Sequence, residues 1–341
     1  MRQFKGFQRG VNLGGWYSQC DHSEQRYDTF IRDEDFAVIR SWGADHVRVP
    51  VDYELLENDD GSPRESGYAR LEHTITLCRA NGLNMVLDLH KTAGFSFDPG
   101  EQEAGFFENE TYQERFFRLW ERIAEHFRSY SDMLAFELLN EVTEQAYCDT
   151  WNRIASECIR RIRTLAPTVN ILVGGYWHNS AVSVKDIDVP IDEYIVFNFH
   201  CYEPLIFTHQ GAYWVDNMPS DFRIGYPKTL EEYREASGIL DRKLAGTIFD
   251  ERVRPIGPAF FEGLFKPALE VARERDIPLY CGEYGVIDLA DREDAVRWLS
   301  DIHDTFEKYA IGRALWNYKE KDFGIAGEDA RPYLNAIADK L

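Results

Sequence analysis

The sequence predicts an α/β protein with a (β/α)8 TIM-barrel fold. Short apolar segments alternate with amphipathic helical segments along the chain, which is typical of a parallel sheet covered by helices. Eight apolar segments can be counted, and eight such units favour closure into a barrel. A length of 341 residues suits one barrel domain. An open doubly wound sheet is the alternative, but no glycine-rich phosphate loop follows an early strand.

The eight predicted strands are short and apolar, and they are separated by turn residues or helical patterns. They span residues 9–13, 44–51, 84–90, 133–140, 170–177, 194–202, 278–284 and 312–318. The helices predicted between them span about residues 33–42, 71–80, 112–127, 151–165, 263–276 and 291–309. The helix at 112–127 has the clearest pattern, because Phe116, Trp120, Ile123 and Phe127 recur at helical spacing and define one apolar face.

One connection is unusually long. About 60 residues separate the sixth predicted strand from the helix at 263–276, and unstructured loops of that length are uncommon in compact domains. The segment contains Trp214 and Tyr226 and shows helical periodicity at 230–244. We therefore predict that residues 205–262 form a small insertion subdomain on the C-terminal face of one domain, residues 1–341.

Composition and charge limit the partners. The formal net charge is −21 and the sequence pI is about 4.9, so the protein repels nucleic acids and anionic lipids. No run of 18 apolar residues is present, and we expect no membrane partner. The six cysteines lack zinc-like spacing. No secretory signal is visible, so we expect a cytoplasmic monomer, or a secreted one whose signal peptide is absent from the printed sequence.

Polar and aromatic residues stand at the ends of six predicted strands. In a barrel, catalytic groups lie at the C-terminal ends of the strands, so one ligand could contact all of them. Each residue alone is more often structural, and the prediction therefore depends on their combination. The candidates, in chain order, are Arg48, His90, Asn140, Glu141, His200, Tyr202, Glu283 and Trp316.

Strand alternation gives one more expectation. Residues two apart share a face, so Glu137 and Glu141 would point the same way, about 13 Å apart along the strand. That separation is too large for the two to share one reaction. A buried carboxylate needs a partner, and we expect Glu137 to pair with His46 or Arg48 in a structural role.

Two glutamates at one end of a barrel suit cleavage of a glycosidic bond. One protonates the leaving oxygen and the other attacks the anomeric carbon, with the carboxyl groups about 5 Å apart in a retaining enzyme. The acid needs a raised pKa and the nucleophile a low one. Arg48 would keep Glu283 ionised, and Tyr202 could donate a hydrogen bond to the same carboxylate. Asn140 could bind the sugar 2-hydroxyl, and Trp316 offers a flat face to the ring.

Six segments carry a family resemblance: HVRVP, LDLH, FELLNE, FNFHCYEP, LYCGEYG and ALWNY. Together, in this order, they resemble glycoside hydrolase family 5, the cellulase family. The resemblance implies a single catalytic domain, a retaining mechanism without metal or other cofactor, Glu141 as acid/base and Glu283 as nucleophile. It also implies supporting roles for the other six candidates and β-1,4-glucan as substrate, with mixed-linkage glucan as a further possibility.

The resemblance also has departures. Lys91 stands where many family members have a second histidine, which puts chain-length preference and endo- versus exo-action in doubt. The start RGVNLGGW resembles exo-β-1,3-glucanases of the same family, so exo-action is the first alternative. A non-catalytic carbohydrate-binding barrel is a weaker one. Metal-dependent hydrolysis through His90 and His200 is weaker still, because they lie on different strands and no H-E-x-x-H pattern occurs.

Overall fold

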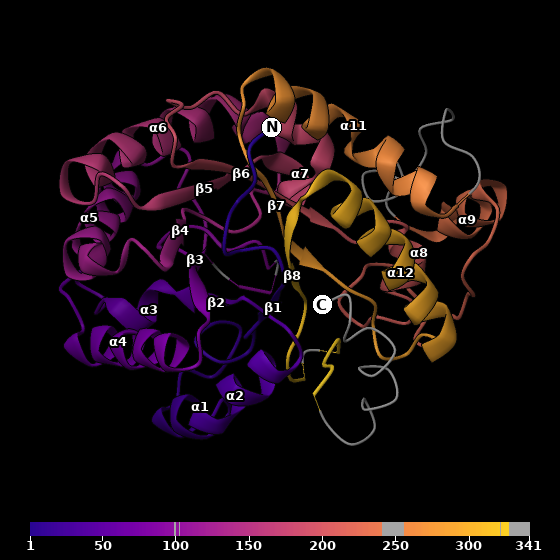
Figure 1. Cartoon of the computed structure of the whole chain (residues 1–341), viewed down its shortest axis with the longest axis horizontal. Helices are drawn as coiled ribbons and strands as arrows, with labels where there is room; N and C mark the ends of the chain where they lie inside the picture. Colours follow the sequence, from indigo (N-terminus) through magenta and orange to yellow (C-terminus); the bar gives the residue numbers. More distant parts are fainter. Residues whose placement is uncertain (99, 102, 241–255, 321, 327–341) are drawn as a thin grey trace.

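The computed structural model describes residues 1–98, 100–101, 103–240, 256–320 and 322–326 as a closed barrel of eight parallel strands. Figure 1 shows the strands at the centre of the molecule and the long helices around them. The predicted barrel is therefore confirmed. The strands are β1 (Gly10–Asn12), β2 (His46–Asp52), β3 (Asn84–Lys91), β4 (Leu134–Glu137), β5 (Asn170–Gly174), β6 (Ile195–Cys201), β7 (Leu279–Tyr284) and β8 (Gly312–Leu315).

The helices form the outer layer, and each long one buries an apolar stripe against the sheet. In α5 the residues Phe116, Trp120, Ile123 and Phe127 are all buried, as their spacing predicts. The helices are α1 (Glu24–Thr29), α2 (Asp33–Ser41), α3 (Tyr53–Leu56), α4 (Glu65–Ala80), α5 (Glu110–Phe127), α6 (Cys148–Leu165), α7 (Tyr176–Asn179), α8 (Leu205–Thr208), α9 (Leu230–Ala236), α11 (Pro258–Glu274) and α12 (Arg292–Tyr309). In the described part of the chain, no helix has both the length and the apolar character needed to cross a bilayer.

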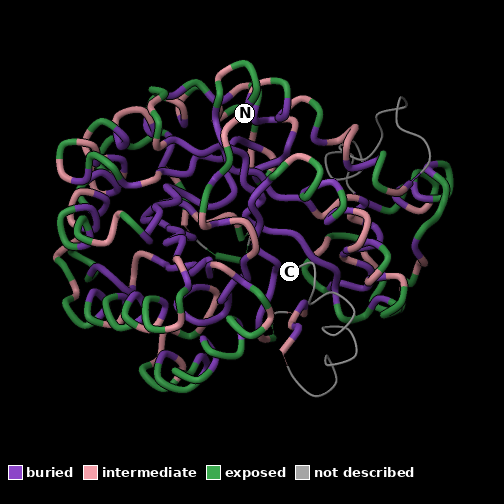
Figure 2. Tube along the Cα trace, viewed as in Figure 1, coloured by how far each residue is buried: buried purple, intermediate pink, exposed green. Residues whose placement is uncertain are grey.

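The inside of the barrel is layered. An apolar layer made by Phe4, Phe7, Val86, Ala135, Leu172, Val196, Tyr280 and Ala314 fills one end. The next inward positions along three of these strands are Asp88, Glu137 and Asn198, which are fully buried and polar. Figure 2 shows that the chain is buried along the central strands. The apolar layer closes the barrel below, so a ligand can approach the polar layer only from the C-terminal ends of the strands.

Three strands end three residues earlier than the sequence predicts, and one of them is β8, which stops at Leu315 rather than at 318. β4 stops at Glu137, and the next two residues, Leu138 and Leu139, both belong to the outer apolar core. Alternation therefore does not continue from Glu137 to Glu141, and that expectation is wrong. β5 stops at Gly174 rather than at 177, because Trp177 and its two successors adopt positive φ angles that no strand accommodates.

The segment predicted as an insertion is described only for 205–240 and 256–262. It contains α8, α9 and the start of α11, which begins five residues before the predicted 263. Tyr226 fastens it to α12, because its backbone N–H bonds Asp294 and its hydroxyl bonds Asp301. Residues 241–244 of the predicted helix at 230–244 lie outside the described residues. That 205–262 forms a subdomain of its own stays a prediction.

Gly67, in the first turn of α4, allows a close approach to α3. A Cβ atom there would lie 1.8 Å from the carbonyl oxygen of Leu55. Alanine normally stabilises a helix relative to glycine, but here we expect Gly67→Ala to lower the free energy of unfolding by about 1–3 kcal/mol through overpacking. Gly238→Ala is the matched control, because no atom lies within 4 Å of its added Cβ. Denaturant titration of both variants tests this; equal stability would contradict the steric argument.

Candidate active site

Arg48 on β2 is the centre of the polar layer. Its Nε and Nη2 donate to the two carboxylate oxygens of Glu137 at 2.7 and 2.8 Å. Nη1 donates to Glu283 at 2.7 Å, and Nη2 lies 3.0 Å from Asp88. Asn12 and Asn140 accept the remaining hydrogen bonds at 3.0 and 2.9 Å. The pairing of Glu137 with Arg48, one of its two predicted partners, is therefore confirmed.

Burial and charge oppose each other in this layer. Burial disfavours the guanidinium charge, but Asp88, Glu137 and Glu283 outweigh it and hold the pKa of Arg48 above its usual value. Burial also raises the pKa of Glu137 although Arg48 opposes it. An arginine that stays charged at every physiological pH thus faces three carboxylates from β3, β4 and β7.

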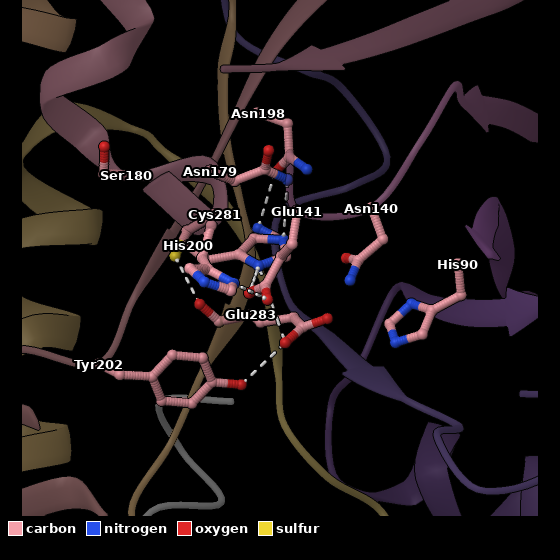
Figure 3. A network of polar contacts seen from close by, with 12 residues as sticks. His90, Asn140, Glu141, Asn179, Ser180, Asn198, His200, Tyr202, Cys281 and Glu283 are labelled. Atoms are coloured by element: carbon pink, nitrogen blue, oxygen red, sulfur yellow. Dashed lines mark hydrogen bonds and ion pairs between the residues drawn. The ribbon is translucent and has the colours of Figure 1, made fainter. Parts of the chain in front are cut away.

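Glu283 on β7 receives hydrogen bonds on both carboxylate oxygens. Arg48 donates to Oε1, and the hydroxyl of Tyr202 donates to Oε2 at 2.9 Å (Figure 3). Burial, followed by the Glu283 and Glu141 charges, raises the pKa of Tyr202, so its hydroxyl keeps the proton that it donates. Both contacts match the expectation from the sequence, and together they place one donor on each oxygen of the Glu283 carboxylate.

Glu141 lies in the loop after β4 with a φ of 39°, a left-handed conformation that is rare for glutamate. Its Oε1 lies 2.7 Å from Nδ1 of His200, and its Oε2 lies 3.0 Å from Nδ1 of His178. One ligand atom each of Glu141, His200 and Glu283 lie within 4.8 Å of one another. The two carboxyl groups therefore have the short separation of retaining glycosidases, not the 6.5–9.5 Å or so of inverting ones.

The expectation of a raised pKa for Glu141 is wrong for this arrangement. Burial raises the pKa, but the hydrogen bonds from His178 and His200 outweigh burial and leave the pKa of Glu141 below its usual value. The physical reason is direct imidazole contact on both carboxylate oxygens. If Glu141 is to protonate a substrate, the proton that it gives must therefore be one that it shares with a histidine.

His90, Asn140 and Trp316 complete the predicted set. His90 bonds Asp88 through Nδ1 at 2.6 Å, and its ring stacks on Trp316 with centroids 5.9 Å apart. Nε2 of His90 and Nδ2 of Asn140 are buried and have no hydrogen-bond partner among the residues that the structure describes. In Figure 3 these two side chains lie on one side of the glutamate pair, and His200 and Tyr202 lie on the other. Unpaired buried polar atoms are costly, and a sugar hydroxyl would satisfy both.

All eight predicted residues thus meet in one site, but two contributors were missed. Asn12 at the end of β1 links Arg48 to the backbone of β7 and β8. His178 follows β5, whose end contributed no candidate. The sequence signal for His178 was present, since it is the first side chain after β5 that can change charge near neutral pH.

Two groups of side chains have the spacing of metal ligands among the described residues. One is Glu141, His200 and Glu283, and the other is His22, Asp52 and Glu54. Protein cations already balance both groups: Arg48 contacts Glu283, and Lys91 lies 2.5 Å from Glu54. His90, one of the two histidines considered for the weak alternative of metal-dependent hydrolysis, belongs to neither group. The donors are therefore committed to ion pairs within the protein.

A barrel with two close, buried glutamates at its open end defines a class, the retaining glycoside hydrolases. Residues 5–322 match a protein-family model described as cellulase, glycosyl hydrolase family 5. The chain therefore belongs to glycosyl hydrolase family 5 and is a glycoside hydrolase acting on β-glucan. The resemblance drawn from the six sequence segments is confirmed.

Curated relatives cover almost the whole chain. Cellodextrinase A from Ruminococcus flavefaciens is 46% identical over 313 residues, which are 92% of this chain and 86% of the relative. Endoglucanase C from Acetivibrio thermocellus is 36% identical over 339 residues, 98% of each chain. The similarity therefore includes every element of the barrel.

Solved structures support the fold. The cellulose synthase subunit Z of Clostridioides difficile superposes with a TM-score of 0.78 at 24% identity, covering 97% of this chain and 99% of that one. Endoglucanase Cel5A of Thermotoga maritima gives 0.77 at 22% identity, covering 98% and 97%. At such identities the similarity concerns the barrel architecture.

Replacing Arg48 with lysine tests the central ion network. A lysine ammonium is a compact charge and cannot bridge Glu137 and Glu283 as the planar guanidinium does. We expect Arg48→Lys to lower kcat/KM on β-glucan about tenfold to a hundredfold, since charged hydrogen bonds contribute about 1.5–3 kcal/mol each. The control is Arg297→Lys, an exposed residue whose surface ion pairs contribute little. Steady-state kinetics and melting curves check both variants; an Arg48→Lys enzyme with parental kinetics would refute the role of the network.

Proposed function

We propose that the protein cleaves β-1,4-glucan chains by endo-action, with Glu283 as nucleophile and Glu141 as acid/base. The observation that carries the proposal is the short separation of the two buried glutamates, within 4.8 Å between ligand atoms, at the open end of the barrel. A relative that covers 98% of the chain is named an endoglucanase, which supports the β-1,4 linkage and endo-action.

The reaction takes two steps, each with balanced atoms. First, a carboxylate oxygen of Glu283 bonds to the anomeric carbon while the glycosidic bond breaks and Glu141 gives its proton to the leaving oxygen. Second, water attacks the same carbon, Glu141 takes the proton of that water, and the ester to Glu283 breaks. Arg48 and Tyr202 stabilise the carboxylate that leaves in the second step.

The remaining candidates bind the sugar in this proposal. The hydrogen bond from Arg48 to Oδ1 fixes the orientation of the Asn140 amide. Its Nδ2 has no partner among the described residues and can therefore donate to the sugar 2-hydroxyl. Nε2 of His90 faces no protein partner and suits a second hydroxyl. The Trp316 ring offers a flat apolar surface to the sugar face. These contacts would strengthen as the ring distorts toward the transition state.

The rim of the site carries exposed aromatic rings that suit a glucan chain. Trp214 is 39% exposed and packs near His209, whose ring contacts Tyr202. This chain of ring contacts connects Trp214 to the side chain that bonds Glu283. Tyr213 beside it is 84% exposed. Such rings fit sugar units beyond the cleavage point and support a substrate longer than a disaccharide.

Trimming of short cello-oligosaccharides is the second candidate. It is favoured by the 46% identity to a relative named cellodextrinase. In this case the enzyme would act from chain ends, and mixed-linkage β-glucan or β-1,3-glucan would serve as further substrates to compare.

We also propose a monomer, because a net charge of −21 opposes self-association.

The two glutamate roles can be separated experimentally. We expect Glu141→Gln to lower hydrolysis of glucan about 10²–10⁴-fold, the usual contribution of a general acid, while an aryl glycoside with a good leaving group reacts much faster than glucan. A 2-fluoro glycoside should label Glu283 in the parent enzyme, detected by mass spectrometry of peptides. Labelling of another residue, or a Glu141→Gln enzyme equally active on both substrates, would disprove these assignments.

Product analysis distinguishes endo-action from chain-end trimming. We expect a rapid fall in the viscosity of carboxymethylcellulose together with a range of oligosaccharides, because endo-action cuts inside the chain. Release of glucose or cellobiose with little change in viscosity would instead support the cellodextrinase-like alternative. Barley mixed-linkage glucan and a β-1,3-glucan, assayed in parallel, compare the linkages.

A further inference from the structure

His178 occupies a strained turn between β5 and the glutamate pair. Trp177, His178 and Asn179 have φ angles of 50°, 54° and 55°, three consecutive left-handed residues without glycine. The backbone N–H of His178 donates to the carbonyl of Val142 at 3.0 Å, which fixes this turn against the residue that follows Glu141. Strained conformations of this kind persist only when surrounding contacts hold them, and they cluster at functional sites.

The turn presents Nδ1 of His178 to Oε2 of Glu141 at 3.0 Å. His200 contacts the other oxygen of the same carboxylate, but the two imidazoles differ in access to water. The side chain of His200 is 1% exposed and that of His178 is 45% exposed. Of these two partners, His178 is therefore the one that can exchange protons with solvent directly.

The charges around this pair favour a proton on His178. Glu141, Glu144 and Glu283 all face it, and they outweigh the burial that lowers the pKa of the imidazole, so the pKa of His178 is raised. His209 from the end of α8 also faces the pair, but burial lowers its pKa to about 4 and it stays neutral. His200 on β6 and the Tyr202 hydroxyl are the other titratable groups near Glu141.

We propose that His178 holds the catalytic proton for Glu141 and exchanges it with solvent. The inference rests on the proposed role of Glu141 as acid/base. In the first step the proton that His178 holds on Nδ1 moves to Oε2 of Glu141, and Glu141 passes one proton on to the leaving oxygen, which leaves His178 neutral and Glu141 ionised. In the second step Glu141 takes a proton from water and returns one to His178. No net proton is gained or lost over one turnover.

This arrangement has a consequence for the pH dependence. Two groups that share a proton titrate as a pair, and the proton is lost only when the pair as a whole is deprotonated. The alkaline limb of kcat/KM then follows the raised pKa of the imidazolium rather than the carboxyl of Glu141. Removing the imidazole leaves a carboxyl that loses its proton at lower pH, so the alkaline limb moves toward acid pH.

Two substitutions separate proton holding from simple positioning. His178→Asn keeps a side-chain donor and tolerates the left-handed backbone, but it cannot hold an exchangeable proton at neutral pH. His178→Phe removes both functions. The exposed residue His73 on α4, which contacts Asp33 on α2, provides the control His73→Asn. Melting curves verify that each variant is folded before kinetics are compared.

The measurement is kcat/KM from pH 4 to 9 on cellotetraose and on 2,4-dinitrophenyl β-cellobioside, whose leaving group needs little acid assistance. We expect both His178 variants to shift the alkaline limb on cellotetraose about one unit toward acid pH, and thus to lose about tenfold at pH 8. The loss on the dinitrophenyl substrate should be much smaller. The control variant should match the parent.

Other outcomes overturn the proposal. A parental pH profile for His178→Asn, with a displaced one only for His178→Phe, would mean that His178 positions Glu141 and holds no proton. Equal losses on both substrates at every pH would mean a structural role. If Glu141→Gln itself shows no dependence on the leaving group, the acid/base assignment fails instead, which distinguishes the two hypotheses.

Discussion

The buried Arg48 guanidinium is the interaction on which the rest of the site depends. Moving one cation and three carboxylates out of water is expensive, and the cost is offset only if every charge has a partner. The geometry meets this condition, since Arg48 directs its donors to Asp88, Glu137 and Glu283 and to two asparagines. Because its partners come from β1, β3, β4 and β7, the same contacts fix the relative heights of these strands and place Glu283 at the open end.

The two glutamates are held by chemically different partners. Glu283 is paired with an arginine that cannot lose its proton and with a tyrosine that keeps its own. Glu141 is paired with two imidazoles, the side chains whose charge changes most readily near neutral pH. A nucleophile must stay ionised until it attacks, whereas an acid/base must gain and lose a proton in every cycle. In the proposed roles, the permanent cation therefore stands beside the nucleophile Glu283 and the titratable pair beside the acid/base Glu141.

The sequence predicts the parts of the site that stay within the sheet. Alternation holds along β2, β3 and β6, which is why the Glu137–Arg48 pair could be anticipated. It fails where the chain leaves the sheet early. Glu141 and His178 lie in turns with positive φ, where strand alternation does not apply, so periodicity could not predict the direction of either side chain.

The turn after β5 and the turn at Glu141 are held in place by contacts with each other. A non-glycine residue in the left-handed region costs on the order of 1 kcal/mol or more, and the turn after β5 contains three of them facing a fourth at Glu141. The strain is offset locally by the bond from His178 N–H to Val142 and by the bond between the His178 ring and Glu141. The first fixes the backbone beside the carboxyl and the second fixes the carboxyl itself. The same turn places Nδ2 of Asn179 3.5 Å from Nε2 of His200, so the strained backbone positions side chains against Glu141 and against its second imidazole partner.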